Sequence, residues 1–283
     1  MVKKLLFVIY KFFYFLNSIL FFLTKKNFLV KLKELIENES YKKIIINQKA
    51  IYFFVPNEIT DWRVNTFFTK EPETLKWIDN FKKKIIFWDI GANIGLYSIY
   101  NALKNKQSLT ISFEPSLQNL RVLSRNISIN NLKNSIHIMP IALSDRTNKF
   151  QLMKENSFEE GSALNSFGIN YNFEGKRFKS KNNYSTYGTS LNSLVENYIL
   201  KIPNYIKIDV DGIEHLILSG FDKYLSNKKI KSVLIEVNEN FNFQFKEIES
   251  LMKFFKFKLQ SKHKSLFATG KFSKSFNYLY NRS

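Results

Sequence analysis

An acidic residue and two glycines mark the stretch of the chain whose residue types and spacing could do chemistry. The run from Ile85 to Ile90 is apolar except at Asp89, which is typical of a strand buried on both faces. Gly91 and Gly95 follow, and apolar residues then recur at helical spacing. α/β proteins bind nucleotide-like ligands beyond the carboxyl end of such a strand, where glycines let the backbone approach the ligand. We therefore expect a ligand site at this turn.

The acidic residue limits which ligand this turn can take. A phosphate-binding loop offers amide donors or a lysine, and a carboxylate at its mouth would repel a phosphate. Asp89 therefore favours a positively charged ligand, and S-adenosylmethionine, with its ammonium and sulfonium groups, fits better than a dinucleotide. A second predicted strand, residues 109–114, ends in Glu114, and an acid at this place can accept hydrogen bonds from both hydroxyls of a ribose.

Two later segments are candidates to complete the ligand site. A third predicted strand, residues 136–139, is followed by Ser144 and Asp145, which either hydrogen-bond the edge of an adenine or cap a turn. Residues 156–188 form the longest stretch without helical or strand periodicity. A loop of this length in a compact domain is usually a lid, a binding loop or disordered, and this one is our candidate for contacts with an acceptor.

A fourth predicted strand carries charged residues where a buried strand should have none. Lys207 and Asp209 share one face of this strand, and Asp211 lies at its carboxyl end. In an open parallel sheet the carboxyl ends of the strands line the ligand crevice. Burying charge there is costly, so pairing or function is expected. His215 falls in the first turn of the next predicted helix.

The elements that must position these residues alternate between strands and helices. This alternation predicts an α/β fold with a doubly wound, mostly parallel seven-stranded sheet of the Rossmann-like type. Before the sheet domain (85–283) we expect a hydrophobic and basic helical segment (1–40), then a hairpin and a lead-in helix (41–84). The seven strands are predicted at residues 85–90, 109–114, 136–139, 205–211, 230–237, 256–259 and 276–280.

The composition excludes several classes of site. The chain has no Cys, so disulfides, thiolate metal sites and cysteine nucleophiles are excluded, and its three His have no metal-ligand spacing. We therefore predict no metal site, and the sequence leaves open whether a metal joins Asp209 and Asp211. The net charge of +19 is concentrated in residues 1–49 and 253–283, and only six of the 43 basic residues are Arg, the side chain favoured in phosphate and base recognition. Nucleic acid is not an expected partner.

Residues 5–23 are apolar and rich in aromatic side chains, with lysines on both sides. This length is near the minimum that spans a bilayer, and Lys11 would be costly inside one. No small-residue cleavage site follows, so a removable signal peptide is not expected. An interfacial helix, a marginal transmembrane anchor and a helix packed on its own domain all remain open, and the flanking lysines favour the first. We expect a cytoplasmic protein, with attachment to the inner face of a membrane left open.

Three motifs of the chain match the pattern of a known family. They are Asp89-Ile-Gly91-Ala-Asn93-Ile-Gly95-Leu-Tyr-Ser98, Phe113-Glu114-Pro115 and Lys207-Ile-Asp209-Val-Asp211-Gly212-Ile-Glu214. Together they resemble the FkbM family of S-adenosylmethionine-dependent methyltransferases, over roughly residues 65–240. The chain departs from the family at Asp211, where many members have Glu, which is one methylene longer.

The resemblance implies S-adenosylmethionine as cofactor and transfer of its methyl group to a hydroxyl, often of a sugar or a polyketide. A glycan or lipid-linked acceptor is a hypothesis that rests on the two termini alone. A base would remove the hydroxyl proton while the two reactants are held in line. The cofactor-binding residues are then Asp89, Gly91, Ala92, Asn93 and Gly95 for the methionine part, Glu114 for the ribose, and Ser144 and Asp145 for the adenine. The candidates for a base or an acceptor-orienting group are Asp209, Asp211 and His215, with a helix-surface role as the alternative for His215.

Two other functions stay open. An NAD-dependent enzyme would keep the fold, but its phosphate turn needs Gly-x-Gly-x-x-Gly, and Gly91, Asn93 and Gly95 lack that spacing. A membrane-surface binding module with a degenerate cofactor site would keep the N-terminal helix, but the acids at four strand ends argue against degeneration. The sequence predicts no oligomeric state.

Overall fold

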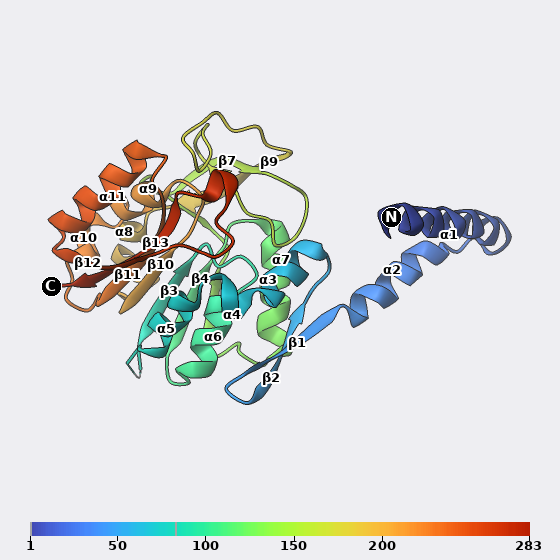
Figure 1. The fold of residues 1–283 in the computed structure, drawn as a ribbon, viewed down its shortest axis with the longest axis horizontal. Helices are drawn as coiled ribbons and strands as arrows, with labels where there is room; N and C mark the ends of the chain where they lie inside the picture. The colour runs from blue at the N-terminus through green and yellow to red at the C-terminus, as the bar shows by residue number, and fades with distance from the viewer. Residues whose placement is uncertain (1, 83) are drawn as a thin grey trace. The chain divides into compact units, whose positions relative to one another are not determined.

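The computed structural model describes residues 2–82 and 84–283, which form two compact units, Met1–Lys42 and Lys43–Ser283 (Figure 1). Residues 1 and 83, which fall in the predicted segments 1–40 and 41–84, lie outside the described residues. Each unit is described by itself below.

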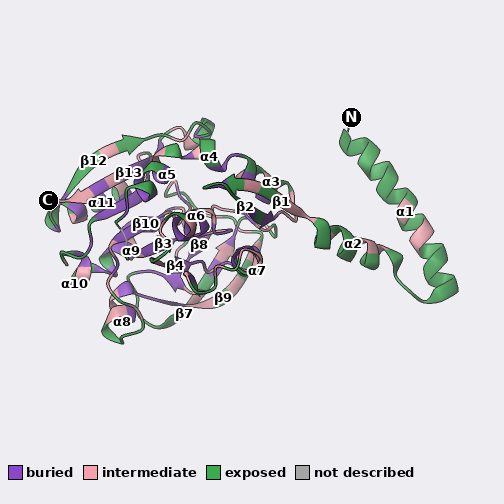
Figure 2. Cartoon of the chain, turned by 90° about the horizontal axis from the view of Figure 1, so that it is seen from below, coloured by how far each residue is buried: buried purple, intermediate pink, exposed green. Residues whose placement is uncertain are grey.

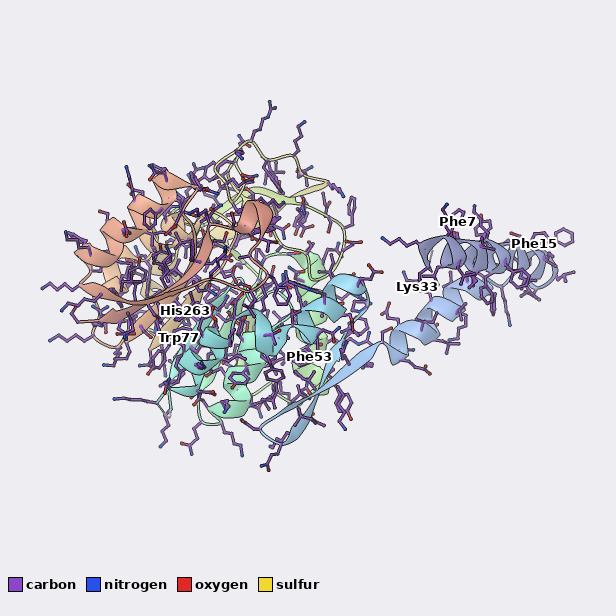
Figure 3. All side chains as sticks on the ribbon, viewed as in Figure 1. Phe7, Phe15, Lys33, Phe53, Trp77 and His263 are labelled. Atoms are coloured by element: carbon purple, nitrogen blue, oxygen red, sulfur yellow. The ribbon has the colours of Figure 1, made fainter. Side chains whose placement is uncertain are left out.

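The first unit is a pair of helices, α1 (Val2–Thr24) and α2 (Phe28–Glu39). Asn17 of α1 accepts a hydrogen bond from the backbone N–H of Leu29 (2.9 Å), and Asn27 caps the start of α2. α1 buries none of its residues, and Phe7 and Phe15 stand off the helix with more than half of their surface exposed (Figure 3). Within the described residues, α1 is the helix long and apolar enough to cross a membrane, a test that a signal sequence also passes.

The second unit is built on a seven-stranded sheet, which confirms the predicted fold class. The strand order is β12-β13-β11-β10-β3-β4-β5 (Figure 1). Every pairing is parallel except those of β13, which runs antiparallel to both of its neighbours. The strands are β3 (Ile86–Ile90), β4 (Leu109–Phe113), β5 (Ile136–Met139), β10 (Tyr205–Ile208), β11 (Ser232–Asn238), β12 (Phe257–His263) and β13 (Ser275–Arg282).

Helices cover both faces of this sheet. α5 (Pro72–Asp79) packs with α6 (Leu96–Lys104), and α7 (Leu117–Ile129) packs on the hairpin described below. A second group of helices packs together beside β11 and β12 (Figure 1). This group is α8 (Leu191–Glu196), α9 (Glu214–Ser219), α10 (Asp222–Leu225) and α11 (Asn242–Phe254). The predicted helix that begins near His215 is divided into α9 and α10, with Gly220 at the end of α9.

Consecutive aromatic residues of β3 show how the two faces are filled. Phe87 contacts Trp77 and Phe81 on the α5 side, with ring centroids 5.9 and 5.4 Å away. Trp88 contacts Phe221 on the other side, with ring centroids 5.2 Å apart. Successive side chains of a strand point to opposite faces, so an apolar run such as this one fits a strand covered on both sides. The buried positions in Figure 2 accordingly concentrate on the central strands.

A smaller sheet was not predicted. Its order is β6-β9-β7-β8, and it places one short strand inside the segment 156–188 and another at its end, where no periodic structure was expected. The reason is composition, because β9 is made of polar and small residues and β8 has only two residues. The strands are β6 (Ala142–Leu143), β7 (Lys149–Glu155), β8 (Ser166–Phe167) and β9 (Asn182–Thr189).

The remaining elements lie before the large sheet and within its last connection. The predicted hairpin is present as β1 (Tyr41–Ile46) and β2 (Lys49–Phe54). Two short helices follow, α3 (Glu58–Asn65) and α4 (Phe67–Lys70). A 3-10 turn, Gly270–Phe272, lies between β12 and β13.

Candidate functional site

A cavity of about 790 Å³ lies at the carboxyl ends of β3, β4, β10 and β11. Segments far apart in the chain complete its lining. They are residues 59–70 of α3 and α4, residues 141–143 of β6 and the turn before it, residues 156–167 between β7 and β8, and residues 265–277 between β12 and β13. The cavity is therefore at the edge of the sheet where the acidic strand ends were expected to converge.

The turn after β3 is held close to the neighbouring strands. Gly91, Asn93 and Gly95 all adopt positive φ angles, of 83°, 50° and 87°. The backbone N–H groups of Gly91 and Ala92 both donate to the carbonyl of Phe113, at 3.0 and 2.9 Å. A Cβ atom on Gly91 would lie 1.9 Å from the carbonyl oxygen of Asp209, so only glycine fits at this crossing of two backbones.

Asp89 and Asn93 each have a buried oxygen with no hydrogen-bond partner among the described residues. Asp89 accepts a hydrogen bond from the Ser98 hydroxyl (2.6 Å) through one oxygen, and its other oxygen is the unpartnered one. Burial raises the pKa of Asp89, although Lys207 opposes this shift. Asn93 donates to the carbonyl of Ser162 (2.9 Å) and belongs to the cavity lining, whereas Asp89 lies outside it.

Glu114 lies at the end of β4 and lines the cavity. Its carboxylate accepts hydrogen bonds from the backbone N–H groups of Asn93 (2.8 Å) and Ser116 (2.9 Å). Burial raises its pKa to about 7, against the opposing effect of these N–H groups. Glu114 therefore ties the turn after β3 to the end of β4 and presents a buried carboxyl to the cavity.

Two roles were predicted for Ser144 and Asp145, which follow β5, and the structure supports one of them. Ser144 and Asp145 are both outside the cavity lining, and the Ser144 hydroxyl accepts a hydrogen bond from the backbone N–H of Arg146 (3.1 Å). The structure thus shows the turn-capping arrangement and gives no support to an adenine contact by these two side chains. The apolar residues 141–143 line the cavity in their place.

A buried network of charges lies at the end of β10. The ammonium group of Lys207 is 2.6 Å from the carboxylate of Asp209, and Lys207 is only 1% exposed. Burial alone would raise the pKa of Asp209, but Lys207 and Lys70 outweigh it and hold this pKa below its ordinary value. Burial, and then the Asp209 carboxylate, raise the pKa of Glu236 well above its ordinary value. A hydrogen bond joins the Glu236 and Asp209 side chains, whose pKa values are shifted in opposite directions.

Asp211 and Glu214 form a second pair of carboxyl groups in the lining. Asp211 adopts a φ of 64° and accepts a hydrogen bond from the backbone N–H of Leu164 (2.6 Å). Burial, and then the Asp209 carboxylate, raise the pKa of Asp211 to about 6. Burial raises the pKa of Glu214 to about 7, and this side chain accepts hydrogen bonds from the backbone N–H groups of Val210 and Gly212. A carboxyl group with a pKa of about 6 can take up a proton near neutral pH.

His215 is not brought to the cavity with the two aspartates. It is 4% exposed, lies outside the cavity lining, and contacts the rings of Phe241 and Phe243 at 6.2 and 5.6 Å between centroids. Burial lowers its pKa to about 4. The environment of His215 is thus that of a packed aromatic side chain, and neither the catalytic nor the helix-surface interpretation describes it.

Several lining residues were not singled out in the sequence. The α3–α4 segment contributes Trp62, Arg63 and Lys70, and the connection between β12 and β13 contributes Phe267. The rings of Trp62 and Phe267 meet edge to face, with centroids 5.7 Å apart. Local sequence patterns did not single out these residues, because α3 and α4 are short and the connection that carries Phe267 is irregular.

Comparisons with known proteins agree with this arrangement. Residues 89–259 match the model of the methyltransferase FkbM domain. "Methyltransferase sdnD" from Sordaria araneosa is 27% identical over 165 residues, which are 52% of this chain and 64% of that protein. The chain thus matches less than two thirds of that relative's length.

Two solved structures are more distant in sequence. The precorrin-6y C5,15-methyltransferase of Geobacter metallireducens is 11% identical, with a TM-score of 0.43 and coverage of 75% of this chain and 87% of that one. TrmK of M. capricolum, solved with S-adenosyl-homocysteine, is 11% identical, with a TM-score of 0.39 and coverage of 74% and 67%. The FkbM match spans more than half of the chain and contains all three motifs. The chain therefore belongs to the FkbM family of methyltransferases, and its cofactor is S-adenosylmethionine.

Proposed function

We propose that this methyltransferase transfers the methyl group to a hydroxyl of a sugar or glycan acceptor. The observation that carries the proposal is Asp211, a half-buried carboxyl with a pKa of about 6 that lines the same cavity as the turn after β3 and Glu114. A hydroxyl needs a base near the reacting oxygen, and a carboxylate of this pKa is suited to that role at neutral pH.

The residues around Gly91, Asn93, Glu114 and residues 141–143, called the cofactor half below, fit S-adenosylmethionine. The unpartnered oxygen of Asn93 and the carboxyl of Glu114 are acceptors for ammonium and hydroxyl donors. The apolar residues 141–143 suit an adenine ring. When bound, the cofactor supplies a methyl group activated by its positive sulfonium.

The rest of the lining, called the acceptor half below, is rich in amide and hydroxyl side chains beside exposed rings. Trp62 and Phe267 are 40% and 42% exposed, so their faces remain available for contact with a sugar. Amides and hydroxyls can both donate to and accept from sugar hydroxyls. These side chains are Asn156, Asn165, Asn238, Asn277, Ser265, Thr269 and Ser275.

The two aspartates have different roles in this proposal. Asp209 stays ionised because Lys207 lowers its pKa, and this makes it a weak base. It pairs with Lys207 and hydrogen-bonds to Glu236, and so holds both side chains in place at the acceptor half. Asp211 takes the proton of the acceptor hydroxyl, while the N–H of Leu164 fixes the position of its carboxylate.

The experiment that tests the proposal has two parts. Calorimetric titration of the full chain with S-adenosylhomocysteine and with NAD should show binding of the thioether alone. Incubation with radiolabelled cofactor and a panel of oligosaccharides should then label at least one acceptor, with the label on oxygen. A preference for amine-bearing over hydroxyl-bearing acceptors would contradict the transfer to oxygen while leaving the family assignment intact.

We also propose that α1 attaches the enzyme to a membrane surface. Its 23 residues correspond to about 34 Å of helix, which exceeds the roughly 30 Å of a bilayer's hydrocarbon core. Lys3, Lys4, Lys25 and Lys26 flank the apolar body, and Lys11 interrupts it. An interfacial position lets all these ammonium groups remain at the headgroups, whereas a spanning helix would bury Lys11.

Vesicle flotation tests this attachment with the full chain. Replacing Phe7 and Phe15 with Ser should release the protein from anionic vesicles, because both rings are exposed on α1. Phe150 and Phe158, which are 75% and 62% exposed on the second unit, give the matched control. Equal flotation of both double variants would contradict attachment through α1.

A further inference from the structure

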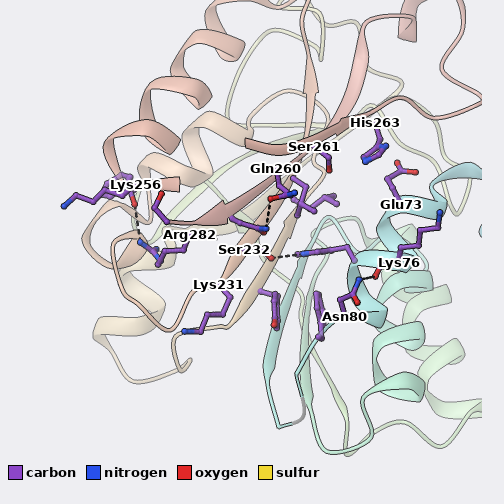
Figure 4. A pocket seen from close by; sticks show the side chains of 18 of the residues that line it. Glu73, Lys76, Asn80, Lys231, Ser232, Lys256, Gln260, Ser261, His263 and Arg282 are labelled. Carbon is purple, nitrogen blue, oxygen red and sulfur yellow. Dashed lines mark hydrogen bonds between the residues drawn. The ribbon is translucent and has the colours of Figure 1, made fainter. Parts of the chain in front are cut away.

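A second cavity, of about 1330 Å³, lies beside α5 (Figure 4). Its walls include Glu73 and Lys76 of α5 and Phe254 and Lys256 at the end of α11. Its floor is formed by side chains of β11, β12 and β13. The volume exceeds the roughly 300–1,000 Å³ that is usual for a small-molecule site, so it has room for an extended ligand.

The second cavity continues the catalytic one along the same face of the sheet. On β11, Ser232 and Leu234 line the second cavity, whereas Glu236 and Asn238 line the catalytic one. Alternate residues of a strand point to one face, so these four side chains form a single row. β13 repeats the pattern, since residues 279 and 281 line the second cavity and Asn277 lines the catalytic one.

A hydrogen bond marks the junction between the two cavities. The Asn277 side-chain amide donates to Glu73, a residue of the second cavity, over 3.0 Å. The two cavities also lie next to each other beside the helices, where Lys70 lines the catalytic cavity and Pro72 lines the second cavity. A ligand in the second cavity would therefore end next to the acceptor half.

The second cavity has a strong excess of positive charge. Among the described residues that line it, Glu73 is the only acidic side chain, and it already accepts from Asn277. The basic residues of the lining are Lys76, Lys228, Lys231, Lys256 and Arg282. Within the described part of the chain, none of the four lysines forms an ion pair. Clustered like charges repel one another and raise the local concentration of anions.

Arg282 differs from the lysines because its guanidinium is hydrogen-bonded to the backbone. Its guanidinium donates to the backbone carbonyls of Ile230 (2.7 Å), Phe255 (3.2 Å) and Leu225. It therefore fixes the loops that form one wall of the cavity. Lys228, Lys231 and Lys256 lie on that wall, where the Lys231 ammonium donates one hydrogen bond to the carbonyl of Lys228 (3.0 Å) and keeps two further N–H donors for a ligand.

The rest of the lining favours a glycan over a single-stranded nucleic acid. Polar groups suited to sugar hydroxyls are present on the floor, at Ser232, Gln260, Ser261 and Asn281 (Figure 4). Binding of bases uses exposed rings on which they stack. Among the described rings of the lining, Phe81 and Tyr205 stack on each other, with centroids 3.8 Å apart, and are 7% and 8% exposed. Phe254 is 76% exposed and offers a single open ring, whereas stacking of successive bases uses several.

We propose that the second cavity binds the anionic units of an extended glycan acceptor, whose hydroxyl then enters the catalytic cavity. This inference rests on the proposed methyl transfer to a glycan and names its substrate class as anionic. The anionic group is a carboxylate or a phosphate carried by the sugar chain, since lysine ammonium groups accept either.

The test measures binding of labelled oligosaccharides to the full chain by fluorescence anisotropy at low ionic strength. The probes are oligogalacturonate, which carries carboxylates, a phosphomannan fragment, which carries phosphates, neutral dextran and a single-stranded oligonucleotide. The cavity variant is K228Q/K231Q/K256Q, and the matched control is K106Q/K133Q/K149Q, which removes the same charge from exposed lysines elsewhere. Titration with S-adenosylhomocysteine in every variant monitors the cofactor site independently.

We expect at least one anionic glycan to bind more tightly than dextran and the oligonucleotide. The cavity variant should weaken this binding about tenfold, the combined effect of three exposed charge contacts, and the control variant by less than about threefold. Which of the two anionic probes binds identifies the anionic group. The absence of binding by both anionic glycans, an equal loss in both variants, or tighter binding of the oligonucleotide would each overturn the inference. Failure to bind S-adenosylhomocysteine would instead count against the proposed function.

Discussion

The two halves of the catalytic cavity are built in different ways. The cofactor half comes mainly from one short stretch, residues 89–115, in which backbone groups hold the turn in place. The acceptor half is assembled from α3 and α4, the end of β11 and the connection between β12 and β13, and it relies on side chains. The difference suggests that changes in the first half will abolish activity altogether, whereas changes in the second will alter the reaction and the choice of acceptor.

The largest effect is expected from Gly91→Ala. The added Cβ would lie 1.9 Å from the backbone oxygen of Asp209, and the positive φ of 83° adds strain. We expect a loss of about 3 kcal/mol in the free energy of unfolding and no measurable binding of S-adenosylhomocysteine. Gly270→Ala is the control, because Gly270 also has a positive φ but nothing within 4 Å of its Cβ position. Similar losses in both variants would show that the crossing of the two backbones is unimportant.

Asp211→Asn should slow the methyl transfer without changing the binding of the cofactor product. The amide cannot take a proton, so kcat should fall by at least about 100-fold, the usual range for loss of a general base. The dissociation constant of S-adenosylhomocysteine should stay within about threefold, because Asp211 is assigned to the acceptor half. Asp145→Asn, which changes an exposed carboxylate outside the lining, is the control. A normal kcat in Asp211→Asn would remove this residue from the proton transfer.

The pH dependence of cofactor binding tests the role of Glu114. Its pKa of about 7 in the free enzyme should fall when donors from a ligand contact the carboxylate, because hydrogen bonds favour the ionised form. Binding then requires loss of a proton below pH 7, so the affinity for S-adenosylhomocysteine should decrease about tenfold from pH 8 to pH 6. Glu114→Gln should bind more weakly at pH 8 and show a flat profile. A flat profile in the wild type would contradict the predicted contact with the ribose.

The smallest effect is expected at His215. The ring is packed against Phe241 and Phe243, outside both halves of the cavity, and its low pKa keeps it neutral. His215→Phe should leave the dependence of kcat on pH unchanged between pH 5 and pH 8. Disappearance of an ionisation from that profile would return His215 to the list of catalytic candidates.

The sequence was sufficient for the large sheet and for the family. Seven predicted strands are present in it, because their apolar runs are long and the helices between them are periodic. β10 and β11 were recognisable for the same reason, although each carries a charged residue. The cofactor and the FkbM resemblance are confirmed, since both rest on motifs that are local in the chain.

Other features depend on contacts that a local pattern does not contain. The small sheet was missed because β9 pairs polar residues with β7 and has no apolar alternation. The contact between Trp62 and Phe267 joins residues from opposite ends of the second unit. Ser144 and Asp145 show a different difficulty, because the local pattern there allowed two interpretations. The Ser144 hydroxyl accepts a hydrogen bond from the backbone of its own turn, as in the turn-capping alternative. Local patterns predicted much of the proposed cofactor half, but not most of the proposed acceptor half.

The place of β13 in the sheet has a consequence for biosynthesis. β13 lies between β11 and β12, so β12 leaves the ribosome before the strand that must join it to the sheet. During that interval β12 has no partner, and the row of side chains that ends at Asn277 is incomplete. The nascent chain can form the turn after β3 long before it has a surface for an acceptor. The two halves of the cavity are therefore completed one after the other during translation. On a ribosome stalled before Ser275, the nascent chain would have a cofactor site without a complete acceptor site.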